Sequence, residues 1–369
     1  MAQLVVCLDG TNQVFNQPHP TNVVLIFKAL GGAPADAGNG SLETSPAGVQ
    51  GKYLPGVGTQ GNPLLKALGS AFGDGIAEPI VRGYTFLSRS WSPGDEIFIV
   101  GFSRGATAAR ALAGFVTAMG LLDPAQYNPA NKDDGYSRAI AAWYQYRQPK
   151  HNLLQQANLN IISGLAGQPM PALAANAFQP PPPIRAVGVF DTVSSLGLPH
   201  VDLSGNALFD FSICDTDLNP LVQNGFHALA ADESRDLFSP TFWADRAGVV
   251  QQIFPGTHSN VGGGYPERGL SDGALDWMLG QLIPAGLPAN PALIVPPIAP
   301  HAGDIARDDG ATFPFKDTPR RPRAFPPCAS VNPTLTARVA VKPGVEMLPD
   351  PTVRAYAPVG LYADGSKLV

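Results

Sequence analysis

The stretch GFSRGATAAR at residues 101–110 decides the fold of this chain. It follows the apolar run IFIV at 97–100 and leads into the small residues of 106–119. The order strand, Gly-x-Ser-x-Gly, helix predicts a nucleophile elbow, a tight turn that presents a serine hydroxyl at the carboxyl end of a strand. The flanking glycines allow the strand and the helix to approach closely. Ser103 is therefore the predicted nucleophile; in the alternative interpretation it only caps the helix.

Apolar runs alternate with segments of helical spacing over most of the chain. This alternation predicts an α/β fold with a mostly parallel sheet and helices on both faces. The expected strands are residues 4–8, 49–54, 97–100, 184–190 and 249–254, and the expected helices are 23–30, 76–87, 106–119, 136–146, 221–231 and one from Ser271 through Leu282.

Two segments interrupt this alternation. Residues 124–183 form an insertion between the nucleophile and the expected acid, and we expect either a lid over the acyl group or a surface-covering subdomain. Residues 284–327 are rich in proline and are expected to form an ordered strap, continuing into a C-terminal segment that ends at 369. Without an internal repeat or a clear linker, the sequence predicts one domain over residues 1–369.

Composition excludes several classes of protein. Charged residues make up 14% of the chain and the net charge is −5, so nucleic acid is not an expected partner. The three cysteines show no metal-binding or CxxC spacing, and Cys7 lies in an apolar run as a small buried residue would. No metal and no cofactor are expected. The amino terminus lacks the pattern of a secretory signal, which predicts a cytoplasmic place of synthesis.

A serine nucleophile needs a base and an acid that orients the base. In α/β-hydrolases the chain order is Ser, then Asp or Glu, then His. Asp191 ends the next apolar strand after the elbow, and His258 follows a later strand and precedes a run of three glycines. Both lie where ligands gather in open α/β sheets. Ser103, Asp191 and His258 are the predicted triad.

Other residues compete for these roles or support them. His227 is the rival base, although its expected helical setting favours a structural role. Asp232 and Asp272 are alternative acids, but Asp272 fits better in the first turn of a helix. Asp9 is a further supporting candidate. A metal site built from Asp9, His258 and Asp272 is conceivable, but these residues have no recognisable ligand spacing.

The oxyanion hole requires two backbone donors. The N–H of Arg104, directly after the nucleophile, is the first candidate. The second is expected from the loop after a neighbouring strand, and Gly10 and Thr11 are the candidates.

Six sequence blocks together resemble a known family. They are LDGTNQ (8–13), YLPGVGT (53–59), GDEIFIVGFSRGATAAR (94–110), GVFDTVSSLG (188–197), HALAADESRDLFSPTFW (227–243) and FPGTHSNVGGGY with GLSDGALDWM (254–278). In this order they resemble the α/β-hydrolase family that includes the type VI secretion phospholipase effectors of Gram-negative bacteria. The resemblance implies an α/β-hydrolase fold and cleavage of phospholipid acyl esters by a Ser–Asp–His triad.

The chain departs from that family pattern in three places. Asn260 stands where an aspartate is common, the closing motifs lack their usual histidine, and the long membrane-binding domain of larger effectors is not expected within residues 1–369. The expectation is a serine hydrolase of carboxylic esters, including lipid or phospholipid acyl esters. The resemblance also implies peripheral contact with a membrane, a secretion-system or immunity partner, and export without a signal peptide. The alternatives are a non-catalytic binding module on the same scaffold and an amidase or peptidase using the same triad.

Overall fold

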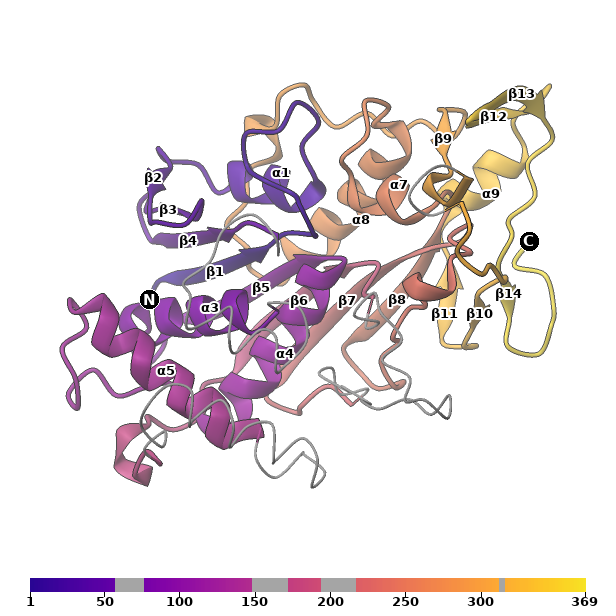
Figure 1. Ribbon diagram of the computed structural model, residues 1–369. Helices are drawn as coiled ribbons and strands as arrows, with labels where there is room; N and C mark the ends of the chain where they lie inside the picture. The colour runs from indigo at the N-terminus through magenta and orange to yellow at the C-terminus, as the bar shows by residue number, and fades with distance from the viewer. Residues whose placement is uncertain (57–75, 148–171, 194–216, 312–315) are drawn as a thin grey trace.

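A nine-stranded sheet lies at the centre of the computed structural model, which describes residues 1–56, 76–147, 172–193, 217–311 and 316–369 (Figure 1). Its strands are β1 (Gln3–Leu8), β2 (Ala35–Asp36), β3 (Leu42–Thr44), β4 (Val49–Leu54), β5 (Glu96–Phe102), β6 (Ile184–Phe190), β7 (Val222–Ala230), β8 (Val249–Phe254) and β11 (Ala329–Val331). Their order across the sheet is β11-β8-β7-β6-β5-β1-β4-β3-β2. Neighbours from β11 to β4 run parallel, and only β3 and β2 are antiparallel. The expected α/β class is confirmed.

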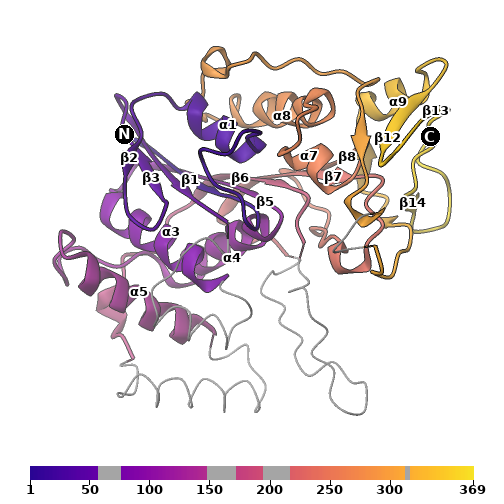
Figure 2. The ribbon, with the colours of Figure 1, turned by 45° about the horizontal axis from the view of Figure 1, so that its top comes forward.

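Helices cover both faces of this sheet, as Figure 2 shows. They are α1 (Asn22–Ala29), α3 (Ala77–Ser90), α4 (Arg104–Met119), α5 (Lys132–Arg147), α7 (His258–Gly262), α8 (Gly269–Leu282) and α9 (Pro333–Val339). Helices α3, α4 and α5 lie on one face, and α1, α7 and α8 lie on the other. Among the described residues, no helix combines the length and the apolarity of a membrane span.

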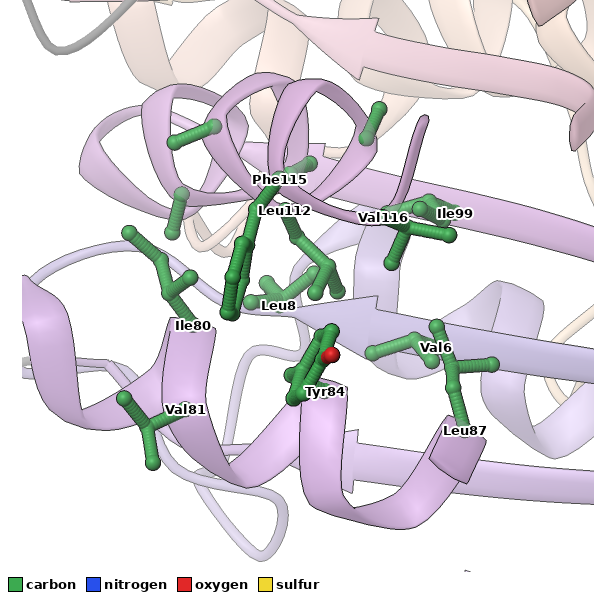
Figure 3. Close-up of a cluster of buried hydrophobic side chains, with 14 of the residues drawn as sticks. Val6, Leu8, Ile80, Val81, Tyr84, Leu87, Ile99, Leu112, Phe115 and Val116 are labelled. Carbon is green, nitrogen blue, oxygen red and sulfur yellow. The ribbon is translucent and has the colours of Figure 1, made fainter. Parts of the chain in front are cut away.

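Strand β1 shows why the sheet is buried on both sides. Leu4, Val6 and Leu8 belong to the apolar core under α3 and α4, part of which appears in Figure 3. Val5 and Cys7 belong to the core under α1 and α8. Because side chains alternate along a strand, a continuous apolar run supplies both cores.

The prediction of a helix over residues 221–231 is wrong. This segment is β7, which pairs in parallel with β6 and β8. Its alanines favour a helix in isolation, but burial of both faces of the strand decides the outcome here. Phe226, Ala228 and Ala230 face the core under α8, whereas Leu229 joins a third cluster with Phe325. The strand is therefore selected by packing on both faces.

The C-terminal segment runs beside β8 and β11 (Figure 1). It contains a three-stranded sheet of β9 (Ala306–Arg307), β12 (Val345–Leu348) and β13 (Asp350–Arg354), and a pair formed by β10 (Ala324–Phe325) and β14 (Leu361–Tyr362). Short 3₁₀ helices are η2 (Ala175–Ala177), η3 (Asp236–Phe238), η4 (Pro291–Leu293) and η5 (Asp309–Ala311). Within the described residues, the proline-rich segment buries Leu287, Ile294, Ala306 and Phe325.

The expected insertion is described in part. Helix α5 contributes Trp143 and Tyr146 to the core, where both rings lie against Phe115 of α4. Residues 148–171 lie outside the described residues, so the lid remains a prediction. Cys214, residues 57–59 of the YLPGVGT block and residues 194–197 of the GVFDTVSSLG block also lie outside them.

Candidate active site

Ser103 occupies a tight turn between β5 and α4. Its φ is +58° and its ψ is −127°, a conformation that non-glycine residues seldom adopt. Glycine is required on both sides. A Cβ on Gly101 would lie 2.4 Å from the Gly105 carbonyl oxygen, and one on Gly105 would lie 2.3 Å from the Leu8 carbonyl oxygen. The Ser103 N–H donates to the Phe190 carbonyl at 3.1 Å, which ties the turn to the end of β6.

Asp191 and His258 meet at the same edge of the sheet. Asp191 follows β6 with a φ of +42° and is fully buried. His258 opens α7 after β8, and its Nδ1 lies 2.6 Å from Asp191 Oδ2. Because a carboxylate only accepts, Nδ1–H is the donor in this short contact, and Nε2 is the other nitrogen of the ring. Among the described residues, the buried Nε2 atom has no hydrogen-bond partner.

Arg323 completes this cluster, and sequence reasoning missed it. Its Nη1 lies 2.6 Å from Asp191 Oδ1, and its Nη2 lies 3.0 Å from Oδ2. In the sequence, Arg323 stands in the arginine run PRRPR at 319–323, and no motif or periodicity there points to a site. Burial alone would raise the pKa of Asp191. The Arg323 charge and the hydrogen bond from His258 outweigh burial, and the pKa lies well below its usual range.

Aromatic rings and a second ion pair hold the imidazole from other sides. Phe102 and Phe238 place their ring centroids 4.7 Å and 5.0 Å from that of His258. Glu233 Oε2 accepts the backbone N–H of His258 at 3.3 Å, and the same carboxylate pairs with Arg235 at 2.7 Å. The histidine at the end of β8 is therefore fixed in both position and tautomer.

The predicted oxyanion loop lies beside the nucleophile. A Cβ on Gly10 would be 3.3 Å from Ser103 Cβ. However, the Gly10 N–H already donates to Asp9 Oδ1 at 2.8 Å, so Thr11 is the better candidate for the second donor. Arg104 Nε donates to Thr11 Oγ1, which joins this loop to the start of α4.

Asp9 lies at the end of β1, and its hydrogen-bond partners are uncharged groups. Its Oδ2 accepts hydrogen bonds from the hydroxyls of Tyr53 and Thr21 at 2.7 and 2.9 Å. Burial raises the pKa of Asp9 to about 6, against the opposing effect of these hydrogen bonds. It supports the loop that carries Gly10, and within the described part of the chain no hydrogen bond joins it to His258.

The remaining polar candidates have structural partners. Asp232 accepts bonds from the Gly256 and Val359 amides and the Tyr356 hydroxyl, and burial raises its pKa. Asp272 pairs with Arg268 at 2.8 Å in the first turn of α8, as its expected helical role requires.

Asn260 and His227 also serve the scaffold. Asn260 Oδ1 accepts from the backbone of Thr257 and caps α7. His227 lies in β7 rather than in a helix, and its Nε2 accepts the Thr192 N–H at 3.1 Å. Burial lowers the pKa of His227 to about 3 and keeps the ring neutral.

Asp9, His258 and Asp272, the residues of the conceivable metal site, do not form a metal-binding group among the described residues. Within the described ranges, no group of three or more His, Cys, Asp or Glu side chains could hold an ion. Asp9, His258 and Asp272 are each engaged in a different hydrogen-bond set.

The chain was compared with known proteins. The sequence model of the family described as "T6SS, Phospholipase effector Tle1-like, catalytic domain" matches residues 2–281. An uncharacterized protein of Saccharomyces cerevisiae, YEL023C, is 26% identical over 271 residues, which cover 70% of this chain and 35% of the yeast protein. The chain thus spans about a third of that relative's length.

Two solved structures show distant likeness. An uncharacterized protein from Pseudomonas aeruginosa has a TM-score of 0.41 and 18% identity, over 80% of this chain and 47% of that one. The Tle1 effector bound to the VgrG spike of the type 6 secretion system has a TM-score of 0.38 and 19% identity, over 72% and 52%. Because the family model matches most of its length, the chain belongs to the family of Tle1-like type VI secretion phospholipase effector catalytic domains.

Proposed function

We propose that this protein is a serine hydrolase that cleaves acyl esters of lipids through Ser103, His258 and Asp191. One observation carries the proposal: the 2.6 Å contact between His258 Nδ1 and Asp191 Oδ2 at the sheet edge where the Ser103 turn emerges. Membership in a phospholipase effector family supports a lipid ester as substrate.

In the proposed mechanism, Ser103 Oγ attacks the acyl carbonyl carbon while His258 Nε2 takes the hydroxyl proton. The negative charge that develops on the carbonyl oxygen is stabilised by the backbone N–H groups of Arg104 and Thr11. The ester C–O bond then breaks, and His258 returns the proton to the leaving alcohol. Water attacks the acyl-enzyme by the same route, which releases the fatty acid and restores Ser103. Asp191 keeps the Nδ1–H tautomer throughout.

The family description also supports a place for this protein in effector delivery. We propose export by a type VI apparatus, contact with a component of it, and peripheral contact with a membrane during hydrolysis. Co-purification with the spike protein of the same cell tests the contact with the apparatus. If the two purified proteins do not bind each other in vitro, this contact is contradicted.

The test of the catalytic proposal is labelling by a fluorophosphonate probe. The wild type should be labelled, and Ser103→Ala should lose labelling and at least about a thousandfold of its turnover while remaining folded by circular dichroism. Ser239→Ala is the matched control. Ser239 is an exposed serine next to Phe238, and among the described residues its hydroxyl donates to the Asp236 carbonyl. It should keep both labelling and turnover.

Substrate panels then separate the reaction types. The rates of cleavage of phospholipids, p-nitrophenyl esters and p-nitroanilides are compared at equal concentrations of enzyme that reacts with the probe. Faster release of fatty acid from phospholipid supports the proposal, whereas preferential p-nitroanilide cleavage would assign an amidase. A folded wild type that the probe does not label would favour a binding module and overturn the proposal.

A further inference from the structure

Arg323 is a buried group that contacts the proposed triad directly and that the mechanism does not use. It belongs to the strap, outside the residues 2–281 that the family model matches. Its side chain is only 4% exposed, and its fork contacts both oxygens of Asp191. A buried bidentate pair of this kind is both short and directional. The acid of the triad is therefore completed by a segment that lies beyond the family-matched part of the chain.

The same guanidinium also holds two backbone segments. Nη1 donates to the Ala230 carbonyl at 2.9 Å, at the end of β7. Nη2 donates to the Phe238 carbonyl at 2.6 Å, in the residue whose ring faces His258. One side chain thus joins Asp191, the end of β7 and the aromatic wall of the imidazole. Asp191 has a positive φ, so its backbone needs such support to keep the carboxylate in place.

The charges around His258 come from three places. Asp191 follows β6, Glu233 and Arg235 lie in the loop after β7, and Arg323 comes from the strap. Two carboxylates are matched by two guanidinium groups. The protonated imidazole that forms during turnover therefore enters a cluster whose fixed charges balance. Without Arg323 the cluster would carry one net negative charge and would favour the imidazolium.

We propose that Arg323 is a positioning residue of the active site: it orients Asp191 for His258 and sets the charge that the imidazole experiences. This inference rests on the proposed function, because it concerns the base of that reaction. The strap is then a working part of the site, and its arginine balances the charge of Asp191 so that His258 remains available as a base.

The test compares Arg323→Met, Arg323→Lys and Arg321→Met in the full-length chain. Arg321 is the matched control, since it belongs to the same arginine run but pairs with Asp236 at the surface and is 77% exposed. The readouts are kcat, KM and the pH dependence of kcat/KM on a p-nitrophenyl ester. In Arg323→Met, kcat should fall about tenfold or more with little change in KM. The acid limb of the pH profile of kcat/KM should move up by about one pH unit.

Arg323→Lys separates charge from shape. Lysine keeps the charge but cannot donate to both oxygens in a fork, so the acid limb should stay at the wild-type position while kcat remains reduced. This variant also decides the matter where Arg323→Met does not fold: wild-type kcat in Arg323→Lys would overturn the proposal. Arg321→Met should match the wild type in every readout.

Two results overturn the inference while leaving the proposed function intact. One is a folded Arg323→Met with wild-type kcat and an unmoved acid limb. The other is a lower kcat with an unmoved limb, which would make Arg323 a purely structural residue. Failure of the proposed function itself would appear elsewhere, as labelling that survives in Ser103→Ala.

Discussion

Two buried aspartates occupy equivalent positions in this sheet and have opposite electrostatics. Asp9 follows β1 and Asp191 follows β6, and each lies at the carboxyl end of a parallel strand. Asp9 accepts three hydrogen bonds from neutral groups, and burial raises its pKa to about 6. Asp191 is at least as buried, but a guanidinium and an imidazole hold its pKa well below the usual range.

The difference shows that the partner, and not the depth, decides what a buried carboxylate can do. Neutral donors satisfy the lone pairs of Asp9 but do not offset the cost of burying its charge. A guanidinium does offset it, so Asp191 stays ionised and can hold the imidazole. Asp9 is therefore suited to stabilise a loop, and Asp191 is suited to the role of acid in the proposed triad.

The same substitution at both positions tests this difference, and Asp191→Asn should have the larger effect. An asparagine no longer stabilises the Nδ1–H tautomer of His258, so we expect kcat to fall by about 10³ to 10⁴. It also leaves Arg323 buried without a counter-charge, which should lower the free energy of unfolding by about 3–5 kcal/mol. Steady-state kinetics and urea denaturation measure the two effects.

The matched variant for this experiment is Asp9→Asn, in which kcat should stay within about tenfold of the wild type, because no group of the triad contacts Asp9 in the described residues. Equal losses of kcat in the two variants would contradict the distinction between them.

From the sequence alone, Ser103, Asp191 and His258 could be predicted to lie at one edge of the sheet, and their role as a triad stays a prediction. Ser103, Asp191 and His258 each follow an apolar strand, and parallel strands bring their carboxyl ends to one edge. That rule needs no knowledge of side-chain packing. Arg323 escaped prediction because it is 132 residues from Asp191 and arrives on an irregular strap without periodicity. Only the folded path of that strap places its guanidinium on the carboxylate.

The error at β7 has a related cause. HALAAD reads as helix because alanine and leucine are good helix formers. Yet the segment lies between β6 and β8, and apolar side chains pack against both of its faces. The free energy gained by burying apolar side chains between these neighbours exceeds the intrinsic helix preference of a few tenths of a kcal/mol per residue. Local propensity was therefore a poor guide where tertiary packing was strong.

The pH dependence of stability also distinguishes Asp9 from Asp191. The pKa of Asp9 is raised in the folded state, so the folded protein binds more protons than the unfolded chain between about pH 4 and 6. The contribution of Asp9 to stability therefore decreases as the pH rises through this window. At about 1.4 kcal/mol per pKa unit, the loss reaches about 3 kcal/mol. Asp191 has the opposite sign, because its contribution is lost as the pH falls below about 4.

Asp9→Asn isolates the first of these contributions. Urea midpoints of the variant and the wild type are compared at pH 4.5 and pH 7. Any pH-independent cost of the substitution cancels in the difference between the two pH values. We expect the variant to gain stability relative to the wild type on going to pH 7. Parallel curves for the two proteins would show that Asp9 does not titrate in this window.

The smallest expected effect is that of Tyr53→Phe, which removes one donor from Asp9. The loss of this buried hydrogen bond should lower the free energy of unfolding by about 1 kcal/mol at neutral pH. Because the bond favours the ionised carboxylate, its removal should also raise the pKa of Asp9 further and move the pH window of stability upward. Tyr84→Phe is the control: its hydroxyl donates to the Gly120 carbonyl at 2.9 Å, and no carboxylate among the described residues accepts from it. It should cost a similar free energy without moving the window, and a shift in both variants would mean that hydroxyl loss alone, and not the carboxylate, causes it.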